Sequence, residues 1–83
     1  MNLVKVTKIS AGRYNIDVNG LSFLLEDSHP EYCGCARVES WVLWNANDLE
    51  IMRFDTKKYA IQAFKNWTPE LIAEMGNRKY LGY

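Results

Sequence analysis

YNIDVNGLSFLL, residues 14–25, gives the clearest structural signal in this chain of 83 residues. Apolar and polar residues alternate on both sides of Asn19-Gly20, the dipeptide that a two-residue type I′ turn prefers. The pattern predicts a β-hairpin in which Val18 pairs with Leu21. In that register the other apolar residues also pair on one face of the sheet, Ile16 with Phe23 and Tyr14 with Leu25. We expect these side chains to form half of the core.

Further strands are predicted on either side of this hairpin. Residues 3–9 are rich in β-branched residues, and a break at residues 10–12 connects them to the strand that begins at Arg13. Residues 38–44 are apolar at both even and odd positions, which is typical of a central strand. A turn at residues 45–48 leads into the last strand, residues 49–54. The polar residues 26–37 are expected to form a long loop.

Two helices are predicted after the last strand. Thr56 can cap a helix whose apolar stripe consists of Ala60, Ile61, Phe64 and Trp67. Thr68 before Pro69 is a second start signal, and Gly76 is expected to end that helix after Met75. The prediction is one α+β domain, residues 1–83. It has an antiparallel β-meander of about five strands, an amphipathic helix packed on one face and a second short C-terminal helix.

The composition is that of a globular protein. Hydrophobic residues make up 48% of the chain and charged residues 24%, which is too apolar for disorder and too interrupted by charge for a membrane span. Ten basic and ten acidic residues leave a formal net charge of zero, so no global field would hold the chain on nucleic acid or a membrane. The first residues have no secretory pattern, and the two cysteines make a poor disulfide framework, so we expect a cytoplasmic location.

His29, Cys33 and Cys35 are the candidate metal ligands. They place one imidazole and two thiols within seven residues, and a tetrahedral zinc ion accepts these atoms when a fourth ligand comes from Asp27, Glu31 or Asp55. The alternative is that the cysteines are small, reduced residues of the loop, because structural zinc sites favour two ligand pairs and this chain has one. Nothing in the sequence indicates a lowered thiol pKa or an orienting acid, and we expect no enzyme activity.

Charge is segregated along the chain. Lys57 and Lys58 lie in the first turn of the predicted helix, where the helix macrodipole disfavours cations by roughly 0.3–1 kcal/mol each. Lys65 follows on the same helix, and residues 1–13 contain three basic residues and no acidic one. This segregation suits a bipolar surface that binds a charged partner. The alternative is an ordinary solvated helix face.

Two tryptophans are further candidates for a binding surface. Trp41 and Trp44 are three positions apart on a predicted strand, so they should lie on opposite faces, with one indole near the surface. An exposed Trp beside Tyr and Arg has the composition of an interface hot spot, although a small domain can also leave an aromatic exposed for want of core volume. The candidate partner-binding residues are therefore Lys57, Lys58, Lys65, Trp41, Trp44, Tyr32 and Arg37.

The hairpin of residues 14–23 and the strand-to-helix junction FDTKKYA, residues 54–60, resemble parts of small bacteriophage accessory proteins. The resemblance touches about half of the chain and transfers no catalytic residue. It implies a non-enzymatic inhibitor or modulator that binds a host protein in the host cytoplasm, including anti-restriction and anti-CRISPR types of anti-defence protein.

The function expected from these observations is that of a small, non-catalytic protein-binding module. One alternative is a nucleic-acid-binding accessory protein that uses the local basic patch of Lys57, Lys58 and Lys65. Another is a small domain stabilised by zinc. We expect a protein partner, no membrane partner, and either a monomer or a homodimer paired through an edge strand.

Overall fold

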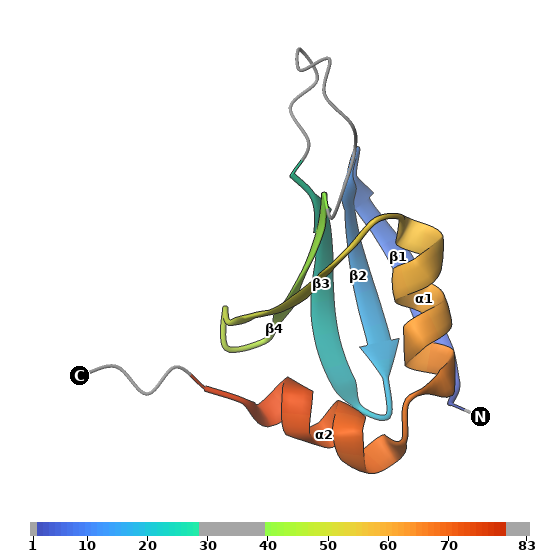
Figure 1. Ribbon diagram of the computed structural model, residues 1–83, viewed down its shortest axis with the longest axis vertical. Helices are drawn as coiled ribbons and strands as arrows, with labels where there is room; N and C mark the ends of the chain where they lie inside the picture. Colours follow the sequence, from blue (N-terminus) through green and yellow to red (C-terminus); the bar gives the residue numbers. More distant parts are fainter. Residues whose placement is uncertain (1, 29–39, 80–83) are drawn as a thin grey trace.

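The computed structural model describes residues 2–28 and 40–79, which form one antiparallel sheet and two helices (Figure 1). The strands are β1 (Val4–Ser10), β2 (Arg13–Val18), β3 (Leu21–Asp27), β4 (Trp41–Asn45) and β5 (Glu50–Phe54). They lie in the sheet in chain order, and each pairs antiparallel with the next. The helices α1 (Lys57–Asn66) and α2 (Pro69–Asn77) follow. The predicted α+β meander is therefore confirmed.

The central hairpin has the predicted register. Asn19 and Gly20 have φ angles of 52° and 79°, and a type I′ turn requires positive φ at both of these positions. Val18 pairs with Leu21, so the apolar residues of β2 and β3 meet on one face of the sheet. The strand β3 continues past the predicted end at Leu25 to Asp27, whose N–H donates to the Gly12 carbonyl over 2.8 Å.

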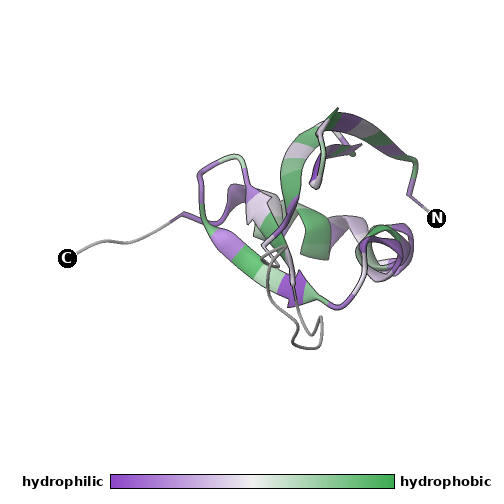
Figure 2. Cartoon of the chain, turned by 90° about the horizontal axis from the view of Figure 1, so that it is seen from above, coloured by the Kyte–Doolittle hydropathy of each residue, from purple (hydrophilic) through white to green (hydrophobic). Residues whose placement is uncertain are grey.

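The core lies between that face of the sheet and the two helices. The Phe23 and Phe64 rings have centroids 4.9 Å apart, which joins β3 to α1. Figure 1 shows α1 alongside β1 and β2 and α2 across the end of the sheet, and Figure 2 shows hydrophobic and hydrophilic residues alternating along the strands. The buried core consists of Ile16, Val18, Phe23, Leu25, Leu43, Ala60, Phe64, Ile72 and Met75.

Both helices begin where the sequence predicts. The Thr56 hydroxyl accepts a hydrogen bond from the Tyr59 N–H at 3.1 Å, and the Thr68 hydroxyl accepts one from the Leu71 N–H at 3.2 Å. These contacts satisfy N–H groups that the first turn of a helix leaves without an intrahelical partner. Within residues 2–28 and 40–79, neither helix has the length and apolar character needed to cross a bilayer.

The prediction that Gly76 ends α2 is wrong. The helix runs on to Asn77, and Gly76 is buried inside its last turn. A Cβ at this position would lie 3.0 Å from Leu21 Cδ1 and 3.2 Å from Phe23 Cζ. Gly76 therefore permits the close packing of α2 on β3, and this requirement depends on tertiary structure that the local sequence does not reveal.

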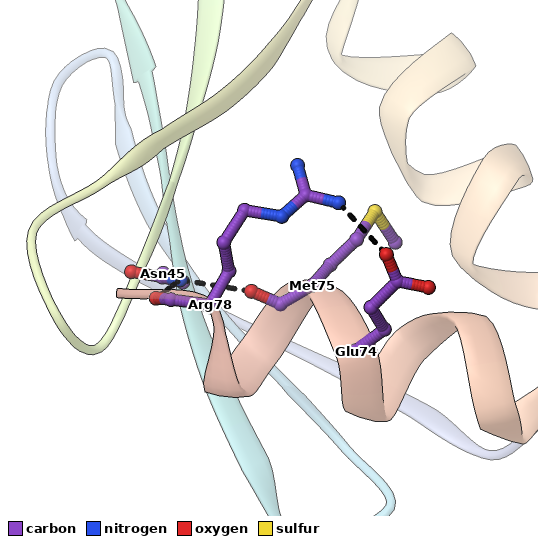
Figure 3. Close-up of polar contacts among 4 residues, drawn as sticks. All are labelled: Asn45, Glu74, Met75 and Arg78. Carbon is purple, nitrogen blue, oxygen red and sulfur yellow. Dashed lines mark hydrogen bonds and ion pairs between the residues drawn. The ribbon is translucent and has the colours of Figure 1, made fainter. Parts of the chain in front are cut away.

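Asn45 closes the end of α2 (Figure 3). It was predicted in a turn, but it is the last residue of β4 and is buried, with 3% of its surface exposed. Its side-chain amide donates to the carbonyl of Met75 over 2.8 Å and to that of Arg78 over 2.7 Å. Its side-chain oxygen accepts from the N–H groups of Asn47 and Leu49, at 2.9 and 3.1 Å. One asparagine thus organises both the β4–β5 turn and the helix end.

A second asparagine does the same for α1. The Asn2 side-chain amide donates to the Phe64 carbonyl at 3.0 Å and to the Trp67 carbonyl at 2.6 Å. The Asn19 side chain donates to the Asn2 oxygen at 3.2 Å. These contacts fix the C-terminal end of α1 to the chain just before β1.

Candidate functional site

The candidate residues fall into two groups. His29, Tyr32, Cys33, Cys35 and Arg37 lie outside the described residues, so the zinc site and the loop part of the binding surface stay predictions. Among residues 2–28 and 40–79, no three His, Cys, Asp or Glu side chains come together in a way that could hold a metal ion. The lysines of α1 and the two tryptophans are described, and the structure places them relative to one another.

The three lysines of α1 do not share one environment. Lys58 and Lys65 are exposed and seven positions apart, which places them on the same side of an α-helix, about 10 Å apart along its axis. Lys57 is partly buried, and its Nζ lies 4.2 Å from the centroid of the Tyr14 ring. This cation–π contact gives Lys57 a structural role that offsets an unfavourable position at the start of the helix.

Trp41 lies next to this contact. The Tyr14 and Trp41 ring centroids are 6.0 Å apart, so Lys57 and the indole both neighbour the ring of Tyr14. Trp41 is partly buried against the core. The sequence signal for this cluster is weak, because Tyr14 and Lys57 are far apart in the chain and belong to different elements.

Trp44 lies on the opposite face of the sheet. It pairs with Leu24, whose neighbours Phe23 and Leu25 both point into the core. The prediction that the two tryptophans lie on opposite faces is therefore confirmed. Trp41 shares the Tyr14 neighbourhood with Lys57, whereas Trp44 lies on the other face of the sheet.

The lysines of β1 extend the positive surface of α1. The helix α1 packs on β1 as well as on β4 and β5, and Figure 1 shows it beside β1. Lys8 pairs with Tyr14, the residue that Lys57 covers, and Lys5 lies on the outer face of the same strand. Neither element contains an Asp or Glu. We call this surface the basic edge, which consists of Lys5, Lys8, Lys57, Lys58 and Lys65.

The lysines of the basic edge make no ion pair with the carboxylates of residues 2–28 and 40–79. The nearest carboxylate by register is Asp17, opposite Lys5. Asp17 already accepts hydrogen bonds from the Asn15 amide at 2.9 Å and the Ser22 hydroxyl at 2.7 Å. Asp17 keeps its negative charge in these contacts and partly offsets Lys5, whereas β1 and α1 themselves contain no acidic residue.

The three described arginines, which lie outside the basic edge, are each paired with a carboxylate. Arg53 contacts Glu50 at 3.0 Å on β5, and Arg78 contacts Glu74 at 3.2 Å on α2 (Figure 3). On the outer face of the sheet, the Arg13 guanidinium lies 3.1 Å from a Glu26 oxygen. The described arginines thus have carboxylate partners, whereas the lysines of the basic edge have none among residues 2–28 and 40–79.

Tyr59 adds an aromatic group to the exposed face of α1. It is 60% exposed and follows Lys58 directly. Large aromatic side chains beside cations are frequent anchors of protein interfaces. The sequence analysis did not select Tyr59, although its position outside the apolar stripe of this helix is a signal that could have found it.

Comparison with protein-family models, curated proteins and solved structures finds no match for this chain.

Proposed function

We propose that this chain is a small binding module that acts without catalysis, and that its basic edge binds an acidic surface of a partner protein. The supporting observation is the gathering of five lysines on α1 and β1, none of them in an ion pair with the carboxylates of residues 2–28 and 40–79. Complementary charge accelerates association and orients the two proteins. Tyr59 would supply the apolar contact that charge alone does not.

A protein partner is favoured over nucleic acid by the charge balance. The formal net charge is zero, and a chain that binds phosphates through counterion release usually has a strong basic excess. Lys57 is also held over the Tyr14 ring, so its ammonium group is less free to follow a phosphate backbone. Nucleic acid stays the second candidate, because an exposed tyrosine beside Lys58 could stack on a base.

The resemblance of residues 14–23 and 54–60 to small bacteriophage accessory proteins leads us to propose a host protein as the partner. Inhibition or modulation of that protein would follow from occupation of its acidic surface. The zinc-stabilised domain remains a separate prediction, since its candidate ligands lie outside the described residues.

The experiment is a pull-down from a bacterial lysate with three forms of the protein. The test variant is Lys58→Glu/Lys65→Glu, and the matched control is Arg53→Glu/Lys79→Glu, which changes the net charge equally at exposed positions away from the basic edge. In nuclease-treated lysate, we expect the wild type and the control to retain a protein that the test variant does not retain. Equal retention by all three forms would contradict the proposal, and retention that nuclease abolishes would support nucleic acid instead.

A further inference from the structure

The edge of the sheet at β1 is open. The sheet begins with β1, and the described residues contain no strand beyond it. Of its seven residues, the five from Val4 to Lys8 pair regularly with β2, and a register shift follows before Ser10. A regular edge strand can pair with an added strand from another chain.

The central turn determines which backbone groups of β1 point outward. A type I′ turn closes on a hydrogen-bonded pair, here Val18 with Leu21. Hydrogen-bonded and non-hydrogen-bonded pairs alternate along an antiparallel ladder. Asp17 and Asn15 of β2 therefore direct their N–H and C=O groups away from β3 and toward β1.

These two residues pair with Lys5 and Thr7 of β1. By the same alternation, Val4, Val6 and Lys8 direct their backbone groups away from β2, toward the free edge. The edge thus offers alternating donors and acceptors at the spacing that an extended chain requires.

The two edges of the sheet differ in charge and regularity. At the other edge, β5 has only five residues, and a register shift interrupts its pairing with β4. Arg53 on β5 is paired with Glu50 of the same strand. Short strands and irregular pairing discourage strand addition, and the β1 edge has the longer regular ladder. The unpaired lysines of β1 discourage the addition of a neutral or basic strand but favour an acidic one.

The charge of β1 selects what can be added. Antiparallel pairing of β1 with a second copy of itself would bring Lys5 and Lys8 of both chains into one ladder with no carboxylate. An added strand rich in Asp or Glu would instead place carboxylates beside Lys5 on the outer face and Lys8 on the helix face, next to α1.

We propose that the partner bound by the basic edge contributes an acidic, extended segment that adds to the sheet as a strand beside β1. This inference rests on the proposed function and specifies its binding mode. Backbone hydrogen bonds to Val4, Val6 and Lys8 supply affinity, and the lysines select an acidic segment over a neutral or basic one. Asn2 fixes the end of α1 to the start of β1, so the strand edge and the helix lysines present one surface.

The test measures binding of fluorescent peptides of about eight residues, enough to span one strand, by fluorescence polarisation. The probe alternates valine and glutamate. In the register with valine opposite Val4 and Val6, the valine N–H groups face β1 and the carboxylates lie on the outer face with Lys5. One control peptide replaces glutamate with lysine, and the other replaces valine with proline, which keeps the charge and removes half of the N–H donors. We expect the wild-type protein to bind the valine–glutamate peptide at least about tenfold more tightly than either control, and this affinity to fall as salt is raised.

The matched protein variants are Val6→Pro and Val6→Ala. Proline is tolerated at an edge position whose N–H faces outward, and it fills a volume similar to that of valine, whereas alanine keeps the N–H and removes side-chain volume. Val6→Pro should bind the probe about tenfold or more weakly than the wild type, while the affinity of Val6→Ala stays within about threefold of the wild type. A circular dichroism melt of each variant establishes that it is folded.

Each other outcome has a defined meaning. Equal binding of the proline–glutamate peptide by the wild type would overturn strand addition whether or not Val6→Pro folds. Loss of the probe in Lys58→Glu/Lys65→Glu but not in folded Val6→Pro would overturn strand addition and leave the proposed function standing. Loss of the probe in folded Val6→Pro but not in Lys58→Glu/Lys65→Glu would support strand addition at β1 and contradict a binding role for the lysines of α1. Binding of oligo(dT) with no binding of the probe, or a concentration-dependent dimer that only Val6→Pro abolishes, would overturn the acidic strand as occupant.

Discussion

Replacement of Asn45 is expected to destabilise the fold strongly, because this side chain connects the end of β4 to the end of α2. Asn45→Ala removes four hydrogen bonds, two donated to the carbonyls of Met75 and Arg78 and two accepted from Asn47 and Leu49. Three of these contacts are only partly buried, so water can replace the side chain there at a net cost of roughly 0.5–1.5 kcal/mol each. The Met75 contact is buried, and leaving its carbonyl unsatisfied costs roughly 1–3 kcal/mol.

The expected loss is therefore about 2.5–7.5 kcal/mol in the free energy of unfolding, a large part of the roughly 5–15 kcal/mol typical of a domain. Urea denaturation followed by tryptophan fluorescence measures it, with the slope of the transition checked for constancy. Asn47→Ala is the control, because Asn47 is exposed and its amide donates to the same Arg78 carbonyl at 3.1 Å. A loss below about 1 kcal/mol in Asn45→Ala, or an equal loss in Asn47→Ala, would refute the reasoning.

Asn45→Asp separates the donor role from the acceptor role. The introduced carboxyl keeps the shape and can accept from Asn47 and Leu49, but its ionised form faces the carbonyls of Met75 and Arg78 without a proton to donate. Burial and these carbonyls should raise its pKa in the folded protein above the unfolded value of about 4. The folded state then binds the proton more tightly, so the stability deficit relative to wild type should shrink as the pH falls through the raised pKa. A deficit that is constant or grows on acidification would contradict this account.

Three further predictions follow from particular contacts. A double-mutant cycle of Lys57→Met with Tyr14→Leu should give a coupling energy of about 0.5–1 kcal/mol in urea denaturation, whereas Lys58→Met with Tyr14→Leu should be additive. Gly76→Ala should lower the melting temperature, because crowding at 3.0–3.2 Å from β3 outweighs the gain of about 1 kcal/mol in helix propensity; a higher melting temperature would show that α2 can move away. Protein purified without chelator should contain zinc if the loop is a metal site, and less than about a tenth of an equivalent by elemental analysis would exclude it; the ligands tested are His29, Cys33 and Cys35.

The elements that could be predicted from the sequence are those determined locally. The β2–β3 hairpin follows from Asn19-Gly20 and the alternation around it, and both helix starts follow from a threonine whose hydroxyl caps its own first turn. The neighbouring positions of β1 and β2, of β2 and β3, and of β4 and β5 follow from short connections, which place consecutive strands side by side. These features need no knowledge of distant residues.

The features that the sequence could not predict depend on contacts between distant elements. Asparagine is common in turns, so the sequence predicts Asn45 in a turn. Its helix-capping role requires carbonyls that lie 30 and 33 positions further along the chain. Glycine is common at helix C-termini, so the sequence predicts that Gly76 ends α2. Its role in close packing depends on the side chains of β3. The contact of Lys57 with Tyr14 is of the same kind.

The candidate site was predicted in part. The sequence shows that residues 1–13 contain no acidic residue and that α1 carries three lysines. That the lysines of β1 and α1 are neighbours depends on the packing of α1 on β1. The open edge of β1 depends on sheet order and on the register set by the hairpin, so it becomes visible only when the strands are assembled.

The most direct test of the basic edge as a binding surface is a two-dimensional ¹⁵N–¹H NMR titration with the valine–glutamate peptide. We predict that the largest shift changes occur at the amides of Val4, Val6 and Lys8, with smaller changes at Lys58 and along α1. The outward-facing amides of β1 should also gain protection from hydrogen exchange when the peptide is bound. Shift changes concentrated on β5, α2 or the outer face around Trp44, with β1 unchanged, would contradict the account.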